Sequence, residues 1–397
     1  MVSSKEKLRR AAPGLLPGVV LGAAFIAALI WLPAGWALVV GALWCLVGVV
    51  QFRRPFPRNA SLALASLMFA MAVVEGGLWI LAPDAPNAGA TKVETPPDWY
   101  PQDPALGFKP RPNTTVQATA TYDGKPLYKV TYHIDAQGGR AVPGSADSGP
   151  TYLFIGDSYM FSEGVEDGDT LPSQFARRLD PPAHVVNLGV PGYGSTQIVR
   201  AMELGLYDRY VTGKVVAVVA WATPPLLWRV TGDASWLGSS PRYDFGNDGK
   251  LHWSGSFDHY RWTRPWDGLA YYARTNVAWI GRAMQASLER QQTRLYVALM
   301  ARLGELVKQR YDAPLILLSN GPEKEPADQP DLQYLPAFDG LRALRGNVSV
   351  VSVRKKLGPP SDWQRQQYFI QHDGHPMPKL NALVTDALVE HLARQGN

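Results

Sequence analysis

A serine follows a short apolar stretch in the segment LFIGDSYMFSEG, which spans residues 153–164. The apolar run 152–155 predicts a buried strand, and Gly156 permits a tight turn into a helix that begins near Ser158. The first N–H groups of a helix have no partner within it, so they can stabilise negative charge on a substrate oxygen. Ser158 is therefore either a nucleophile for acyl transfer or only the N-cap of a helix.

A base for that serine is available near the C-terminus, in the segment HDGHPMP that starts at His372. A serine hydroxyl is a weak nucleophile unless a neighbouring base takes its proton. In a bent loop the Asp373 carboxylate would hold one ring nitrogen of His375 and leave the other for Ser158. His372 is a competing base, and the segment could instead be a polar loop in which Asp373 caps a turn.

A glycine-rich segment, NLGVPGYGST, lies between these two regions at residues 187–196. Its glycines follow an apolar strand and permit close backbone approach, so the N–H of Gly189 could help to hold a substrate oxyanion. The alternative is a flexible strand-to-helix loop. The segment is not GxGxxG, and the chain contains no Walker A pattern, so a nucleotide site is not indicated.

Each of these segments lies after a predicted strand, and a parallel sheet gathers such strand ends at one edge. The serine-first, Asp-His-last order with a glycine loop between them resembles the SGNH (GDSL-type) hydrolase and acyltransferase superfamily, over roughly residues 150–395. The resemblance implies that Ser158 is the nucleophile and first oxyanion donor, and that Gly189 is the second donor. It implies Asp373 and His375 as triad partners, a three-layer flavodoxin-like α/β fold, and no cofactor or metal.

One position departs from the family pattern. The third family block usually supplies an asparagine to the oxyanion hole, whereas here the strand ends in VVAWATPPLLWR, and Thr223 is the nearest side-chain donor. Losing an oxyanion donor typically costs about 2.7–4 kcal/mol of barrier. Thr223 is either a replacement donor or simply a strand-end residue before prolines. We expect Asp157, Tyr193 and Trp228 to contribute to substrate binding.

Strand and helix patterns alternate from residue 151 onward, which favours a parallel sheet covered by helices on both faces. We predict strands at 151–155, 184–188, 214–221, 314–319 and 348–353, and helices at 171–180, 196–209, 293–311 and 378–394. A small β-rich segment at 105–149 precedes this domain (150–397), and Asp123-Gly124 within it predicts a hairpin. An insertion at about 228–285 is rich in tryptophan, which either stacks on sugar rings or packs the insertion's own core.

The composition excludes several classes of protein. Charged residues make up 18% of the chain, below the usual share of about 25%, and the net charge of +5 is scattered, so nucleic-acid binding is not expected. Cys45 is the single cysteine, which excludes an intrachain disulfide. The low charge indicates instead that part of the chain lies in lipid.

Three apolar stretches within residues 1–82 predict membrane-spanning helices at 11–32, 36–52 and about 60–81. Basic residues lie before the first and between the second and third, so both loops should be cytoplasmic. Everything after residue 82, including a linker at 83–104, would then lie outside the cytoplasm of a bacterium, with the inner membrane as anchor. Glu75 would lie inside the third span, where a carboxyl usually faces a partner.

The leading hypothesis is a membrane-anchored serine esterase or O-acyltransferase that acts on acyl, and particularly acetyl, esters of extracytoplasmic polysaccharide or on small esters. Its partners would be the bilayer and polysaccharide-synthesis membrane proteins. The rival is a non-catalytic module of the same fold that binds glycan or a synthesis complex, motivated by the missing asparagine and by Glu75. A third possibility is a lipid-directed esterase with an apolar lid at 225–285.

Overall fold

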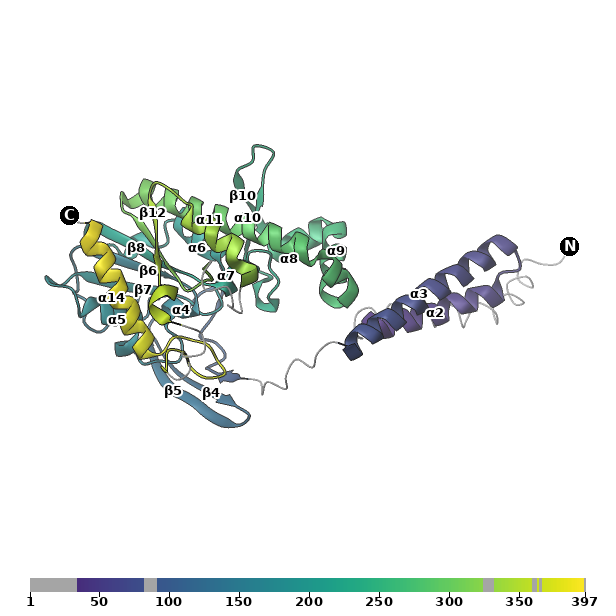
Figure 1. Cartoon of the computed structure of the whole chain (residues 1–397), viewed down its shortest axis with the longest axis horizontal. Coiled ribbons are helices and arrows are strands. Elements are labelled where there is room, and N and C mark those ends of the chain that lie inside the picture. Colours follow the sequence, from purple (N-terminus) through teal and green to yellow (C-terminus); the bar gives the residue numbers. More distant parts are fainter. Residues whose placement is uncertain (1–33, 82–90, 324–331, 359–362, 364–365, 396–397) are drawn as a thin grey trace. The chain divides into compact units, whose positions relative to one another are not determined.

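The computed structural model describes residues 34–81, 91–323, 332–358, 363 and 366–395 (Figure 1). The chain divides into two compact units. One contains α2 (Ala34–Gln51), α3 (Pro55–Leu81) and α9 (Pro265–Asn276), and the other contains every described strand.

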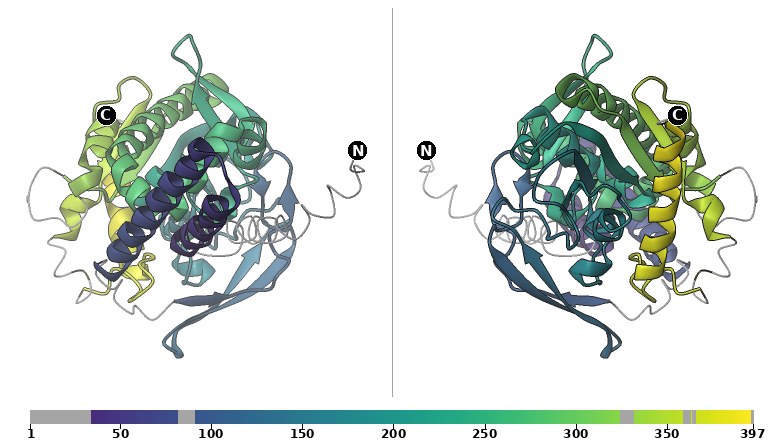
Figure 2. Two further views of the ribbon diagram at one scale, coloured as in Figure 1. Left: turned by 90° about the vertical axis from the view of Figure 1, so that its right-hand side faces the viewer. Right: turned by 90° about the vertical axis from the view of Figure 1, so that its left-hand side faces the viewer.

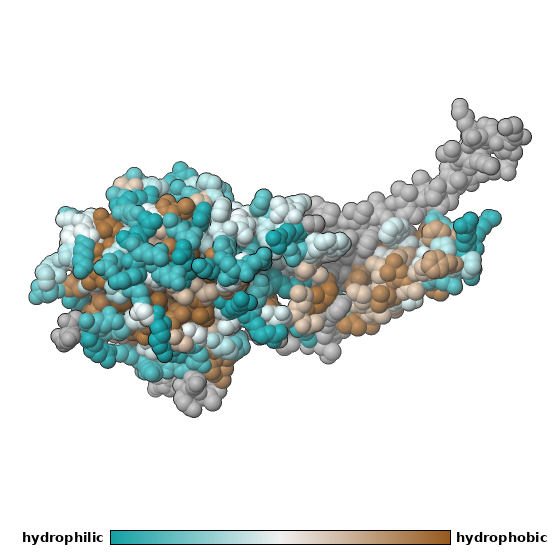
Figure 3. All heavy atoms as spheres, turned by 90° about the horizontal axis from the view of Figure 1, so that it is seen from above, coloured by the Kyte–Doolittle hydropathy of each residue, from teal (hydrophilic) through white to brown (hydrophobic). Residues whose placement is uncertain are grey.

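The helices α2 and α3 pack against each other and expose large apolar side chains, seen as brown surface in Figure 3. These include Leu43, Leu46, Phe56, Leu64, Leu67 and Phe69. Within the described residues, one helix is long and apolar enough to cross a membrane, Pro55–Gly76 of α3, and Glu75 lies in it. The apolar part of α2 is shorter, Leu38–Gln51. The predicted span 11–32 lies outside the described residues, so a multi-pass anchor stays a prediction.

The second unit is built on a parallel sheet of five strands in the order β7-β6-β8-β11-β12. The strands are β6 (Thr151–Gly156), β7 (His184–Gly189), β8 (Val215–Ala222), β11 (Leu315–Ser319) and β12 (Val348–Ser352). All were predicted to within about one residue at each end. β6 is the first of these strands in sequence, and it lies between the next two, β7 and β8. The strand order therefore reverses direction between β6 and β8. Open α/β sheets of this flavodoxin-like order bind ligands at that point.

Successive side chains of each strand enter two separate cores, which is why the strands read as continuous apolar runs. Ile155 faces α6 (Ser195–Glu203), α11 (Leu335–Arg342) and the later part of α10 (Ala278–Tyr311). Phe154 faces α5 (Leu171–Ala176) and α14 (Pro378–Gln395). The predicted three-layer arrangement is therefore present.

Several elements differ from the prediction. The helix expected at 196–209 ends at Glu203, because Gly205 adopts a positive φ of 68°. The insertion, which showed no periodicity, forms a hairpin, helices that include α9, and the beginning of the long helix α10. The helix predicted to begin near Ser158 is α4 (Ser158–Phe161). Elements without a sequence prediction are α7 (Pro224–Arg229), β9 (Pro241–Phe245), β10 (Leu251–Ser256), α8 (Phe257–Thr263), α9, α12 (Arg354–Leu357) and 3-10 turns at Asp167–Asp169, Asp208–Tyr210, Ser235–Leu237 and Leu332–Tyr334.

A three-stranded antiparallel sheet precedes the parallel one, in the order β1-β4-β5. The predicted hairpin is confirmed: β4 (Thr114–Tyr122) and β5 (Lys125–Ile134) pair through a turn in which Asp123 and Gly124 both have positive φ. Figure 2 shows this long hairpin in blue at the margin of the unit. β1 (Lys92–Glu94) and the β2 (Gln102–Asp103)–β3 (Gly107–Phe108) pair begin inside the stretch predicted to be a linker, so part of that stretch forms strands.

Candidate active site

The hydroxyl of Ser158 lies at the carboxyl end of β6, where the sheet order reverses. Asp157 caps the short helix α4 by accepting a hydrogen bond from the Tyr159 N–H (3.0 Å), so the N-cap is Asp157 and not Ser158. Ser158 is the first residue of α4, and its side chain is free to act outside the helix. Ser158 is largely buried, with 5% of its surface exposed.

The structure brings His375 and Asp373 to this serine, although His375 and Ser158 are 217 positions apart in the sequence. His375 Nε2 lies 2.8 Å from Ser158 Oγ, a hydrogen-bond distance. The other ring nitrogen, Nδ1, makes a short hydrogen bond to Asp373 Oδ1. A carboxylate that holds Nδ1–H leaves Nε2 as an acceptor for the serine proton.

A tight turn fixes the orientation of this imidazole. Tyr159 Oη donates to Gly374 O (2.8 Å), and Gly374 adopts φ +87°, which favours glycine. The backbone N–H of His375 also donates to Asp373 Oδ1 (3.1 Å). His372 stacks on Tyr122 with ring centroids 3.8 Å apart and takes no part in the contact. The structure therefore places His375, and not the competing His372, against Ser158.

The predicted second oxyanion donor is already engaged. The N–H of Gly189 donates to Asn187 Oδ1 (3.1 Å), within the end of β7. A Cβ on Gly189 would lie 2.1 Å from the Phe161 nitrogen, so this glycine is required for close packing of β7 against α4. In the structure, the absence of a side chain at Gly189 allows the end of β7 to pack closely on α4.

The turn that follows β7 presents a different backbone donor. Gly192 has φ +86°, and its N–H donates to no acceptor in the described part of the chain. The Arg229 guanidinium links this turn to Asp157, because Nη1 donates both to Tyr193 O (2.7 Å) and to Asp157 Oδ2 (3.2 Å). The sequence signal for Gly192 was present in the glycine run, but spacing alone did not distinguish it from Gly189.

Thr223 follows β8, the strand next to β6, and caps α7 without a side-chain hydrogen bond. Its side chain is fully buried, and its Oγ1 has no hydrogen-bond partner among the described residues. Buried hydroxyls normally have a partner, so this unpaired hydroxyl at the end of the strand next to β6 keeps Thr223 as the candidate replacement for the family's asparagine.

The structure gives Asp157 and Tyr193 packing contacts and places neither at an open surface. Asp157 is fully buried, and burial raises the pKa of its carboxyl while the Arg229 charge opposes that shift. Tyr193 Oη donates to Phe108 O (2.7 Å), and the two rings pack edge to face. Both residues support α4 and the Gly192 turn, and their contact with substrate stays a prediction.

Trp228 forms part of an aromatic pair beside that turn. Its ring packs edge to face on Trp236, with centroids 6.4 Å apart, and Trp236 Nε1 donates to Gly192 O (3.0 Å). Trp236 is 48% exposed, and its Nε1 edge holds the indole beside the Gly192 turn. The sequence singled out Trp228 as a substrate-binding residue, whereas Trp236 was only one of the tryptophans of the insertion. The side chain of Trp279 lies outside the described residues.

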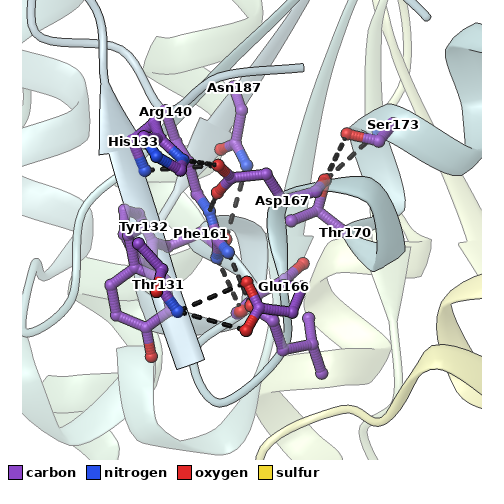
Figure 4. A network of polar contacts seen from close by, with 12 residues as sticks. Thr131, Tyr132, His133, Arg140, Phe161, Glu166, Asp167, Thr170, Ser173 and Asn187 are labelled. Atoms are coloured by element: carbon purple, nitrogen blue, oxygen red, sulfur yellow. Dashed lines mark hydrogen bonds and ion pairs between the residues drawn. The ribbon is translucent and has the colours of Figure 1, made fainter. Parts of the chain in front are cut away.

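A buried arginine fixes the loop that leaves α4 (Figure 4). The Arg140 guanidinium donates to the carbonyl oxygens of Phe161, Ser162 and Val165 at 2.6–2.8 Å. Its Nε donates to Asp167 Oδ1 (2.8 Å). Because a buried charge is tolerated only with such compensation, this clamp holds the segment 161–167 in one conformation. The sequence analysis did not single out Arg140.

The loop held by Arg140 carries Glu163, whose Oε2 lies 3.6 Å from His375 Nε2. Burial alone would lower the pKa of His375, but the charges of Glu163 and Asp373 outweigh it and raise that pKa to about 9. Burial also raises the pKa of the Glu163 carboxyl, and the His375 charge opposes the shift. The imidazole thus has a carboxylate near each nitrogen.

No group of three or more His, Cys, Asp or Glu side chains among the described residues is arranged to hold a metal ion. A cavity of about 390 Å³ is lined by Arg140, Ser145, His184, Arg209 and Tyr210, among others. It lies near the amino end of β7, whereas Ser158 is at the carboxyl end of β6.

No protein-family model matches the chain, and no curated protein sequence matches it. Several solved structures are similar. A lipase from a goat rumen metagenome aligns over 61% of this chain and 97% of its own, at 10% identity and a TM-score of 0.37. An acetyl xylan esterase from Butyrivibrio proteoclasticus aligns over 63% and 64%, at 14% identity and a TM-score of 0.30. A catalytic mutant of an acetylxylan esterase from Geobacillus stearothermophilus aligns over 62% and 96%, at 12% identity and a TM-score of 0.33.

Proposed function

We propose that this chain is a serine ester hydrolase or O-acyltransferase. One observation carries the proposal: Ser158 Oγ lies 2.8 Å from His375 Nε2, while Asp373 holds the other ring nitrogen. In this arrangement a serine can act as an acyl acceptor because the base, its orienting carboxylate and helix N–H groups meet at one point.

The reaction has two steps. His375 Nε2 takes the proton of Ser158 as Oγ bonds to the acyl carbon, and the same proton then passes to the leaving alcohol oxygen, which yields an acyl-serine. Water or a sugar hydroxyl gives its proton to Nε2 as its oxygen bonds to the acyl carbon, and Nε2 then passes that proton to Ser158 Oγ as the acyl–Oγ bond breaks. The oxyanion of each step is held by the N–H groups of Ser158 and Gly192 and by the Thr223 hydroxyl.

The substrate class that fits best is an acylated carbohydrate. The Trp228–Trp236 pair supports it, because an exposed indole face beside the Gly192 turn can stack on a sugar ring. The apolar helix Pro55–Gly76 supports a membrane anchor, with the site on the extracytoplasmic side as the basic-residue pattern predicts. An acetyl ester of a cell-surface polysaccharide meets both conditions.

The test uses the full-length chain in detergent with a chromogenic acetyl ester and a serine-directed fluorophosphonate. We expect the protein to hydrolyse the ester and to be labelled, and Ser158→Ala to lose both properties. His375→Asn should fall to a similar level, while the matched His372→Asn on the same turn should retain full activity. Labelling that persists in Ser158→Ala, or wild-type protein that never labels, would overturn the proposal and favour a non-catalytic glycan-binding module.

A second measurement tests the carbohydrate. Trp236→Ala should raise KM for an acetylated oligosaccharide by about tenfold and leave the small chromogenic ester unaffected. Trp253→Ala is the matched control, because Trp253 is equally exposed (50%) but lies on β10 against Arg200. Equal effects of the two substitutions would exclude a specific sugar contact at Trp236. Labelled acetyl on an added oligosaccharide, rather than free acetate, would identify a transferase.

A further inference from the structure

Glu163 is a buried carboxyl that the serine–histidine–aspartate mechanism does not use. It stands two residues after α4, and its N–H donates to the Ser158 carbonyl oxygen (3.0 Å). Only 16% of its side chain is exposed. Among the described residues its carboxylate accepts no hydrogen bond, and its ionic contact is His375 Nε2 at 3.6 Å. Such a group must have a compensating charge nearby when it is ionised.

The position of Glu163 is set by rigid neighbours. Ser162 before it adopts the left-handed conformation (φ +63°), and Arg140 binds the carbonyl oxygens of both Ser162 and Val165. Gly164 after it donates to Tyr132 Oη (2.9 Å). The carboxylate is thus held near the histidine by the same clamp that fixes the exit from α4, rather than by chance packing of a surface chain.

The charged groups around Glu163 leave the imidazole as its nearest cation. Asp373 and Asp157 also face it and are repulsive, while Arg229 is attractive but is bound to Asp157. Three tyrosine hydroxyls lie close to Glu163, those of Tyr100, Tyr128 and Tyr132. Burial is the main cause that raises their pKa values, and the Glu163 charge raises them further. These hydroxyls stay neutral and do not balance the carboxylate.

We propose that Glu163 is a positioning residue that stabilises the His375 imidazolium formed when Ser158 attacks the ester. The inference rests on the proposed function. The proton moves from Ser158 Oγ to His375 Nε2 and later to the leaving oxygen, and Glu163 remains ionised throughout. With Asp373 at Nδ1 and Glu163 beside Nε2, the positive charge is shared between two carboxylates in a buried site, where such charges act strongly.

The same charge sets the pH range of the enzyme. A general base must be neutral to accept a proton, so the rate rises with pH through the pKa of His375, and we expect a wild-type midpoint of about 9. An opposite charge at this range shifts a pKa by about 1–3 units. Glu163→Gln keeps the shape and removes the charge, so its midpoint should fall by more than one pH unit and its high-pH kcat should fall about tenfold.

The experiment measures fluorophosphonate labelling and kcat/KM against pH for the full-length chain. Glu166→Gln is the matched control, because Glu166 is on the same loop but is exposed and accepts from the Thr131 N–H. It should leave the midpoint unchanged. Glu163→Asp keeps a charge further from Nε2 and should lie between wild type and Glu163→Gln. It carries the test if the glutamine variant does not fold.

The possible failures are distinct. If wild-type protein labels at Ser158 and the Glu163 variants have the wild-type midpoint, the inference about Glu163 is wrong and the proposed esterase stands. If wild-type protein does not label at any pH, the proposed function fails and the inference fails with it. A loss of stability without a change of midpoint would mean that Glu163 only supports the loop.

Discussion

Replacing Thr223 by valine should make the protein more stable and the enzyme slower. The Thr223 hydroxyl is fully buried and has no partner among the described residues. Burying an unpaired hydroxyl costs about 1–3 kcal/mol on mutational scales, and valine has nearly the same shape. Thr223→Val should therefore raise the free energy of unfolding by about 1–2 kcal/mol, since the native state no longer holds an unsatisfied group.

The activity should change in the opposite direction. If Thr223 Oγ1 donates to the oxyanion in place of an asparagine, its removal should lower kcat by about 10²–10³-fold, with little change in KM. Thr223→Ser keeps the hydroxyl and should retain most of the activity. The assay pairs chromogenic ester kinetics with urea unfolding of the full-length chain in detergent.

Two results would refute this reasoning about Thr223. A gain in stability with unchanged kcat would show that the hydroxyl is buried for no catalytic reason. A loss of stability in Thr223→Val would show that Oγ1 has a partner in the resting protein, so it is not waiting for substrate. Only the combination of greater stability and lower kcat supports an oxyanion donor at this position.

Three further predictions follow from the same site. Asp373→Asn should lower kcat by about 10⁴-fold, because the imidazole loses the carboxylate that fixes its tautomer; a loss below tenfold would exclude that role. Gly189→Ala should prevent stable folding or displace α4, since a Cβ there would lie 2.1 Å from the Phe161 nitrogen; a crystal structure with α4 unmoved would contradict this. The raised pKa of His375 means that its protonation stabilises the fold below about pH 6.5 and that this contribution is lost as pH rises through about 9. Urea unfolding should show that loss, at most about 3 kcal/mol, in wild type and not in His375→Asn.

Local patterns were sufficient for the sheet and for the residues at its edge. The apolar runs that became β6, β7, β8, β11 and β12 were visible because strands buried on both faces need apolar side chains at every position. The hairpin at Asp123-Gly124 was visible because its turn needs positive φ at both positions.

The roles of individual polar groups were less predictable. Gly189 was expected to donate to an oxyanion, but its N–H binds Asn187 and its missing side chain admits Phe161. Asp157 and Tyr193 were expected to touch substrate, but both support the loops around Ser158. Each of these outcomes depends on a contact between segments that are distant in sequence.

By itself, the sequence determined the order of the elements, because strand ends of one direction gather at one edge of a parallel sheet, and its resemblance to a known family implied that Ser158, Asp373 and His375 meet at that edge. Only the tertiary structure decided that His375 rather than His372 meets the serine and that Arg140 holds the Glu163 loop in place. The physical reason is the distance in sequence over which each signal acts. Periodicity indicates only which side chains within one helix or strand face the core. Hydrogen bonds and charge contacts depend on distances of a few ångströms that are set only when the whole core packs.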